Sequence, residues 1–106
     1  MNLENTGLNN IPQALVGQNS SLESIILPSG CTELGYGCLQ ACTSLKSITI
    51  PSTVTSLGES CFEDCTGLTS VTFATNAQGG TSIQTLGKYC FQNCRHLTGI
   101  NLPNSI

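Results

Sequence analysis

A segment of this chain repeats itself at a fixed spacing, and this feature restricts the possible folds more than any other. Residues 45–65, LKSITIPSTVTSLGESCFEDC, align with residues 22–42, LESIILPSGCTELGYGCLQAC, 23 positions earlier. The pattern returns after Leu68, where the spacing to the next unit at Leu97 grows to 29 residues. A repeat of this length is typical of solenoids, in which successive units stack and bury a shared core.

The register of the repeats predicts one solenoid segment that covers residues 1–106. It predicts a partial repeat at 1–21, complete repeats at 22–44, 45–67 and 68–96, and a partial repeat at 97–106. The six additional residues of the third complete repeat fall within 74–82, whose Asn, Gly and Ser content predicts a loop. Such a loop can carry binding or be a tolerated bulge, and both interpretations stay open.

Each repeat contains the same predicted order of local structure. Stretches that alternate between inward apolar and outward polar residues predict strands at 24–27, 47–50, 70–73 and 99–102. Proline ends three of them because it cannot donate to a ladder, at Pro28, Pro51 and Pro103. A second extended piece is expected at 31–34, 54–57 and 83–86, before a recurring glycine at which a Cβ would cause strain. Tight helical or 3₁₀ turns are predicted after each glycine.

The predicted fold class is therefore an α/β repeat solenoid that is mostly β, right-handed, with parallel sheets and short turns. The repeated positions follow L-x-x-I-x-[IL]-P-x-x-[V/C]-x-x-L-G-x-x-C-[FL]-x-x-C, and this pattern resembles the BspA-type leucine-rich repeat from Leu8 to Ile106. The resemblance implies a leucine-rich-repeat fold and a secreted or cell-surface location. It also implies a non-enzymatic adhesion or binding role, with no cofactor, toward a protein or glycan of a host or neighbouring cell.

The composition excludes several kinds of partner. Charged residues make up 8% of the chain and its net charge is −3. Three cations, Lys46, Lys88 and Arg95, are too few to contact a nucleic-acid backbone. No stretch approaches the roughly 18–20 apolar residues of a membrane span, so membrane insertion is not expected.

Six of the seven cysteines form three C-x-x-x-C pairs, Cys38/Cys42, Cys61/Cys65 and Cys90/Cys94. Each pair has the same phase in its repeat, so the cysteines are expected to line up in two columns along the solenoid. Buried thiols, disulfides along a column and a metal site are the alternatives; the first is favoured because cysteine is often buried. The spacing does not suit zinc, and a single histidine, His96, leaves no catalytic constellation, so neither metal ligands nor catalytic residues are predicted.

The outward strand positions form two columns of small, mostly hydroxyl-bearing side chains, about 4.8 Å apart along each column. They predict the ligand-binding residues Ser24, Ile26, Ser47, Thr49, Ser70, Thr72 and Asn101. Such a surface suits hydrogen bonding to a glycan or a flat protein face. It lacks the Trp, Tyr and Arg anchors of tight interfaces, so weak or multivalent binding is expected.

A self-assembling building block is the alternative function. Leu8 and Ile106 have the same phase of the repeat, and neither end shows a polar capping repeat. The open edge of a parallel sheet is a template for another chain. Head-to-tail stacking into a filament is therefore a second expectation.

Overall fold

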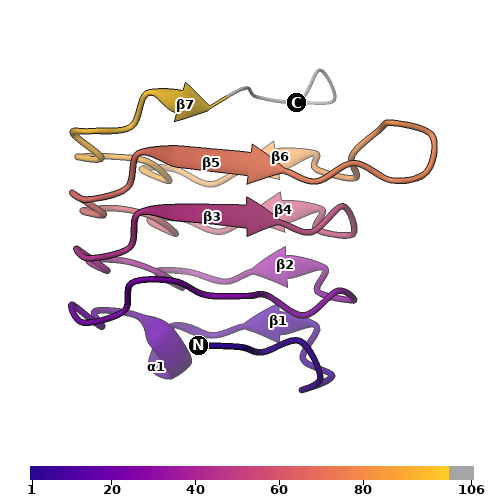
Figure 1. Cartoon of the computed structure of the whole chain (residues 1–106), viewed down its shortest axis with the longest axis horizontal. Helices are drawn as coiled ribbons and strands as arrows, with labels where there is room; N and C mark the ends of the chain where they lie inside the picture. Colours follow the sequence, from indigo (N-terminus) through magenta and orange to yellow (C-terminus); the bar gives the residue numbers. More distant parts are fainter. Residues whose placement is uncertain (101–106) are drawn as a thin grey trace.

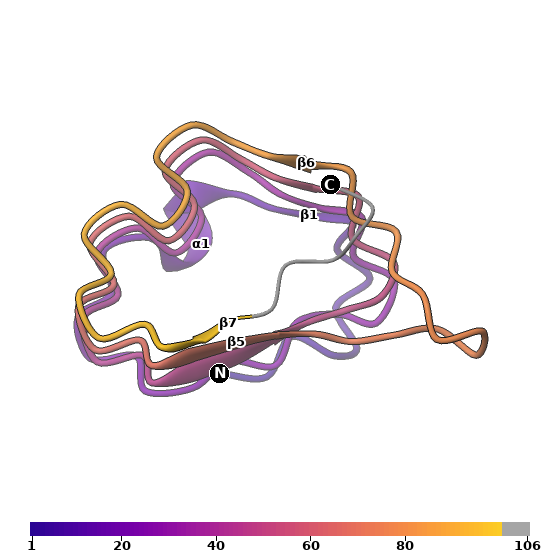
Figure 2. The same ribbon diagram turned by 90° about the horizontal axis from the view of Figure 1, so that it is seen from above.

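The computed structural model describes residues 1–100, and these form a coil of stacked turns. We call the turns rungs and define them by residues 1–21 (rung 1), 22–44 (rung 2), 45–67 (rung 3) and 68–96 (rung 4). The near strands run to the right, the far strands run to the left, and the chain climbs as it proceeds (Figure 1). The coil is therefore right-handed, as predicted. Seen from above, the rungs superimpose as closed outlines with strands on two opposite sides (Figure 2).

Two parallel sheets run along the coil. One has the order β1 (Asn10–Ile11), β2 (Glu33–Leu34), β4 (Ser56–Leu57) and β6 (Thr85–Leu86). The other has the order β3 (Ser47–Ile50), β5 (Ser70–Phe73) and β7 (Gly99–Ile100). Strand pairing follows the sequence repeat, for example Leu34 with Leu57 and Ile48 with Val71. The predicted parallel solenoid is confirmed.

The cysteine-bearing segments form a third hydrogen-bonded layer, built from turns where helical or 3₁₀ turns were expected. In rung 3 the amides of Cys61 and Cys65 donate to carbonyls three residues earlier, which closes two separate turns. Ser60 and Asp64 have left-handed backbones, with φ of 59° and 65°, so a right-handed helix cannot continue through them. The amide of Phe62 is thereby free to donate to the Cys90 carbonyl of rung 4 at 2.8 Å.

The one helix among residues 1–100 is α1 (Gln13–Val16) in rung 1. It begins directly after Pro12, which occupies the position of the recurring glycine in the other rungs. Proline fixes φ near the helical value and suits the start of a helix. The helix in rung 1 therefore follows from the replacement of the recurring glycine by Pro12.

Inward side chains of all rungs build one continuous core. Phe62 is fully buried and its ring stacks on that of Phe91, with centroids 5.3 Å apart. The core also contains the inward strand residues and six of the seven cysteines: Ile25, Leu27, Ile48, Ile50, Val71, Cys31, Cys38, Cys42, Cys61, Cys65 and Cys90.

Some of the predicted strands are shorter or absent. The second extended pieces are strand only in their last two residues, as β2, β4 and β6. Only two residues of the predicted strand 99–102 are described, and they form β7. The prediction of a strand at 24–27 is wrong, because this stretch makes a single isolated bridge, between Ile26 and Asn2. Its side toward β3 carries no ladder.

Candidate ligand-binding face

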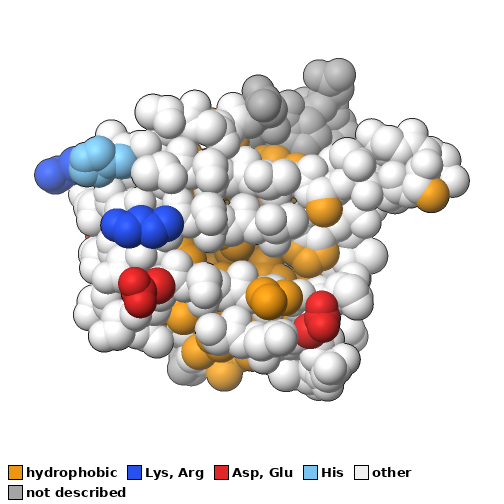
Figure 3. Space-filling view, in the orientation of Figure 1, with side chains coloured by type: hydrophobic (Ala, Val, Ile, Leu, Met, Phe, Trp, Pro, Cys, Tyr) orange, Lys and Arg blue, Asp and Glu red, His pale blue; other side chains and the backbone are white. Residues whose placement is uncertain are grey.

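Six of the seven predicted ligand-binding residues lie on one outward surface, formed by 24–27, β3 and β5. We call this surface the outer face. Ser24, Ile26, Ser47, Thr49 and Thr72 are exposed there, while Ser70 is half-buried. Asn101, the seventh, lies outside the described residues. The middle of this face is white and orange, and charged side chains lie toward its left and right edges (Figure 3).

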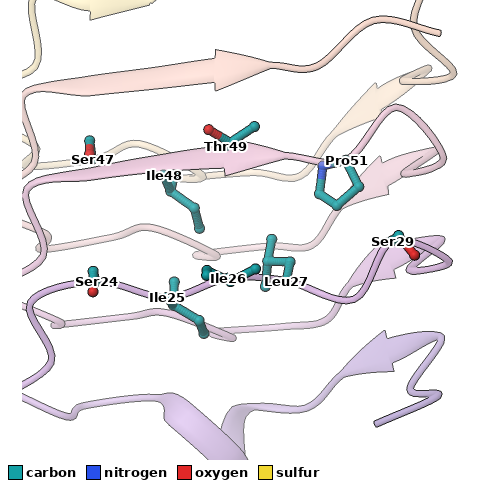
Figure 4. Close-up of a pocket in the computed structure, with 9 residues that line it drawn as sticks. All are labelled: Ser24, Ile25, Ile26, Leu27, Ser29, Ser47, Ile48, Thr49 and Pro51. Carbon is teal, nitrogen blue, oxygen red and sulfur yellow. The ribbon is translucent and has the colours of Figure 1, made fainter. Parts of the chain in front are cut away.

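A groove of about 450 Å³ crosses the outer face between 24–27 and β3. Figure 4 shows the residues that line it: Ser24, Ile25, Ile26, Leu27, Ser29, Ser47, Ile48, Thr49 and Pro51. Four of the predicted residues therefore meet around one concave site. Ser70 and Thr72 do not line the groove and lie on the neighbouring strand β5.

The lower edge of the groove has backbone groups without a partner strand. The Ile26 amide donates to Met1 and its carbonyl accepts from Leu3, so both groups of Ile26 point away from β3. Neighbouring residues of an extended chain direct their backbone groups to opposite edges. Ile25 and Leu27 therefore direct their backbone amides and carbonyls toward β3.

The upper edge is equally unpaired. The carbonyls of Lys46 and Ile50 accept hydrogen bonds from the amides of Thr69 and Ala74 in rung 4. Because neighbouring residues of a strand direct their backbone groups to opposite edges, the amides and carbonyls of Ser47 and Thr49 point toward the groove. Within residues 1–100, no backbone hydrogen bond joins 24–27 to β3. The groove is thus a gap in an otherwise regular sheet.

Two sequence differences between successive rungs coincide with the missing ladder. At one end of the β3–β5 ladder, the Thr69 amide and hydroxyl both donate to the Lys46 carbonyl, at 2.8 and 3.0 Å. One rung lower, Lys46 occupies the place of Thr69 and has no hydroxyl to donate. At the other end, Ala74 donates to Ile50, whereas Pro51 occupies the equivalent place and has no amide hydrogen.

The two rungs that flank the groove remain joined on their other sides. β2 pairs with β4, and the amides of Gly37, Leu39 and Ala41 donate to rung 3 carbonyls at 2.8–2.9 Å. Near one end of the groove, the Thr53 hydroxyl donates to the carbonyls of Ser29 and Cys31 at 3.0 and 2.6 Å. The gap is therefore local to the outer face.

The groove combines an apolar floor with neutral polar groups at its rim. Ile25, Leu27 and Ile48 expose only 7%, 5% and 4% of their surface. None of the lining residues carries a charge. An apolar pocket of this volume with a few convergent polar groups is typical of ligand sites. The sequence did not predict the floor residues as part of a site, because their inward positions assigned them to the core. The available signal for a gap was Pro51, which lacks an amide hydrogen and aligns with Ala74 in the next repeat.

Six of the seven cysteines form two columns, Cys38/Cys61/Cys90 and Cys42/Cys65/Cys94, which are buried except at Cys94, and all seven are free thiols. The Cys61 thiol lies beside those of Cys38 and Cys90, and burial raises its pKa well above the ordinary value. In the second column, the Cys65 thiol donates to the Leu39 carbonyl at 3.0 Å, and burial raises its pKa to about 12. Such thiols are poor nucleophiles because the thiolate is the reactive form.

Other candidate features of the sequence do not gather into a site. Residues 1–100 contain no group of three or more His, Cys, Asp or Glu side chains placed to hold a metal ion. His96 lies at the surface, with Nδ1 2.7 Å from the Thr66 carbonyl. In the loop 74–82, the Asn76 side chain accepts hydrogen bonds from the amides of Gln78 and Gly80, so the loop is organised by its own residues.

The geometry defines the class of protein first: a right-handed parallel solenoid with leucine-rich-type repeats and a groove on its outer face. The sequence matches the family described as BspA type leucine rich repeat region (6 copies) over residues 2–106. The chain therefore belongs to the BspA-type leucine-rich repeat family, whose repeats generally mediate protein binding or adhesion. Members are usually extracellular or at the cell surface.

Searches of curated proteins and of solved structures gave no match. Among residues 1–100, no helix has the length and apolar character needed to span a membrane.

Proposed function

We propose that this chain is a non-enzymatic binding module that adheres through its outer face to a protein or glycan of a host or neighbouring cell. The observation that carries the proposal is the meeting of Ser24, Ile26, Ser47 and Thr49 around one neutral groove. Their side chains come from two successive rungs, so the site is a product of stacking. Family membership supports the same role.

The surface chemistry favours modest affinity for each site. The outer face offers hydroxyls and one exposed aliphatic side chain, Ile26, which is 51% exposed. The exposed tyrosines, Tyr36 and Tyr89, belong to the turn layer and do not line the groove. Binding of this kind becomes strong when many copies act together on one surface.

A glycan and extracellular-protein binding screen tests the proposal. Thr49→Lys places a long cation at the groove, and it is expected to abolish the binding found with the wild-type chain. Thr85→Lys is the matched control, since Thr85 is an exposed strand threonine in the other sheet. Equal loss in both variants, or binding unaffected by Thr49→Lys, would contradict a site on the outer face.

Head-to-tail self-association is a second candidate, favoured by the burial along the coil. Leu57 and Phe62 of rung 3 are almost completely buried, at 1% and 0% exposure, whereas Leu86 and Phe91 of rung 4 are only partly buried. A rung from another copy would cover them. Sedimentation velocity between micromolar and millimolar chain is expected to show growing particles; a constant monomer mass would exclude this candidate.

A further inference from the structure

We propose that the groove accepts one extended, uncharged peptide strand of another protein, which completes the broken sheet between 24–27 and β3. The inference rests on the proposed binding function and specifies the site and the chemistry of the partner. It goes beyond recognition by side chains, because the main recognition groups are backbone amides and carbonyls of both rungs.

The hydrogen-bonding groups of the two edges suit a peptide main chain. Ile25 and Leu27 on one side, and Ser47 and Thr49 on the other, each direct an amide and a carbonyl into the gap. Along each edge these residues are two positions apart, or about 6.6 Å in an extended chain. A peptide strand presents alternating donors and acceptors at this same spacing on both of its edges.

The lining of the groove specifies the side chains of the strand. Because the floor of Ile25, Leu27 and Ile48 is apolar and the whole lining is uncharged, a charged side chain that entered would lose its hydration without an opposite charge. Alternate residues of the strand should therefore be aliphatic. The outward residues between them should be small or hydroxyl-bearing, like Thr49 beside them.

The chain supplies the mechanical basis for insertion. Paired strands lie about 4.7–4.9 Å apart, so a strand between two edges requires about twice that separation. The β2–β4 ladder and the turn layer hold rungs 2 and 3 together on their other sides. Insertion therefore requires the outer face to widen about those sides, which would act as the hinge.

A second copy of this chain is a poor source of the strand. The segments with the required pattern, β3 and β5, are already paired with each other over four residues. Releasing either one would break the sheet of the donor copy. The occupant is therefore a free segment of a different protein.

The test uses the whole chain and a blocked peptide, acetyl-SITIP-amide, which copies residues 47–51, carries no charge and has the required pattern. Amide hydrogen exchange is followed by NMR. Without peptide, the amides of Ile25, Leu27, Ser47 and Thr49 are expected to exchange quickly, while those of Ile48 and Ile50 in the β3–β5 ladder exchange slowly. Saturating peptide is expected to slow the four groove amides at least tenfold.

Three controls separate backbone from side-chain recognition. A peptide with proline in place of its threonine lacks one amide hydrogen and should bind at least tenfold more weakly. In the protein, Thr49→Pro removes a groove amide and should have the same effect. Thr49→Val keeps the amide, removes only the hydroxyl, and should change peptide affinity less than threefold.

Four results would overturn the inference. The groove amides could exchange slowly before peptide is added, or become protected as the concentration of the chain alone rises, which would identify a second copy as occupant. The peptide could instead protect Asn2 or Ile100, near the two ends of the described coil. Finally, Thr49→Val could abolish peptide binding, which would indicate recognition through the hydroxyl.

The two proposals can fail separately. A glycan or protein ligand that is lost in Thr49→Val, with no protection by peptide, supports adhesion through side chains and overturns strand insertion. Peptide protection with no ligand in the screen supports strand insertion and overturns glycan or folded-protein adhesion.

Discussion

Gly58→Ala should strongly destabilise the solenoid, because successive rungs approach most closely at the recurring glycine. A Cβ on Gly58 would lie 2.6 Å from the Gly35 carbonyl carbon and 2.8 Å from the Tyr36 nitrogen. Ordinary van der Waals contacts of a Cβ are 3.4–4 Å. The obstacle is backbone, so no side-chain rotation can relieve it.

The magnitude follows from what must move. The Gly58 amide donates to the Leu34 carbonyl at 2.7 Å, beside the β2–β4 ladder, so relief of the contact stretches these bonds. Overpacking typically costs about 1–3 kcal/mol, and each weakened hydrogen bond adds about 1 kcal/mol. Alanine lowers the entropy of the unfolded chain, which offsets about 0.4–1 kcal/mol. We expect a net loss of about 3 kcal/mol.

Urea unfolding followed by circular dichroism measures this loss as a change in the free energy of unfolding. A loss of this size would lower the melting temperature by roughly 12–24 °C in a domain of about 100 residues. Gly35→Ala is a graded control, since its Cβ would meet the Asn10 side chain at 3.2 Å and the Ile11 carbonyl at 3.3 Å. At Gly30 nothing lies within 4 Å, and Gly30→Ala should be neutral or slightly stabilising. If Gly58→Ala costs under about 0.5 kcal/mol, or no more than Gly35→Ala, the close-approach argument is wrong.

Three further predictions concern the core and its thiols. Phe62→Ala should cost about 3–5 kcal/mol in urea unfolding and Phe91→Ala clearly less, because Phe91 is only partly buried; equal losses would contradict the burial gradient. Dithionitrobenzoate at pH 8 should titrate seven thiols in denaturant and few in the native chain within minutes; rapid native reaction of all seven would contradict the burial of the six other than Cys94. Burial raises the folded-state pKa of Cys65 to about 12, so the contribution of this protonated thiol to the free energy of unfolding should be fully present below about pH 9 and be lost as the pH rises toward 12. Melting temperatures that stay constant to pH 11 would exclude this.

Much of the fold could be predicted from the sequence because the repeat sets its own register. Residues 23 positions apart, such as Leu34 and Leu57, pair in the sheet, and this follows from phase alone. The turns were harder, because left-handed backbones at Ser60 and Asp64 are selected by hydrogen bonds to the next rung. A single-sequence pattern contains no signal for such contacts.

The candidate site could be predicted only in its outward half. Ser47 and Thr49 were assigned from strand alternation, and the structure places them at a groove. The groove itself becomes apparent only when equivalent positions of two rungs are compared: Ala74 donates its amide hydrogen to the rung below, and Pro51 has none to donate. Proline was interpreted as the end of a strand, whereas its missing donor also leaves the carbonyl of the rung below without a partner.

The close glycine contact and the groove lie between the same two rungs. Gly58 sits against Gly35 on the β2–β4 side, while 24–27 and β3 line the groove on the outer face without a backbone hydrogen bond between them. If the β2–β4 side is the hinge for strand insertion, Gly58→Ala should change peptide affinity in addition to stability. Gly87→Ala is the matched control, because its Cβ would collide with the Gly58 backbone between rungs 3 and 4, away from the groove. At a temperature where both variants are folded, affinity should change at least threefold in Gly58→Ala and less than twofold in Gly87→Ala. Equal changes would show that the opening of the groove does not depend on the packing of the two rungs that flank it.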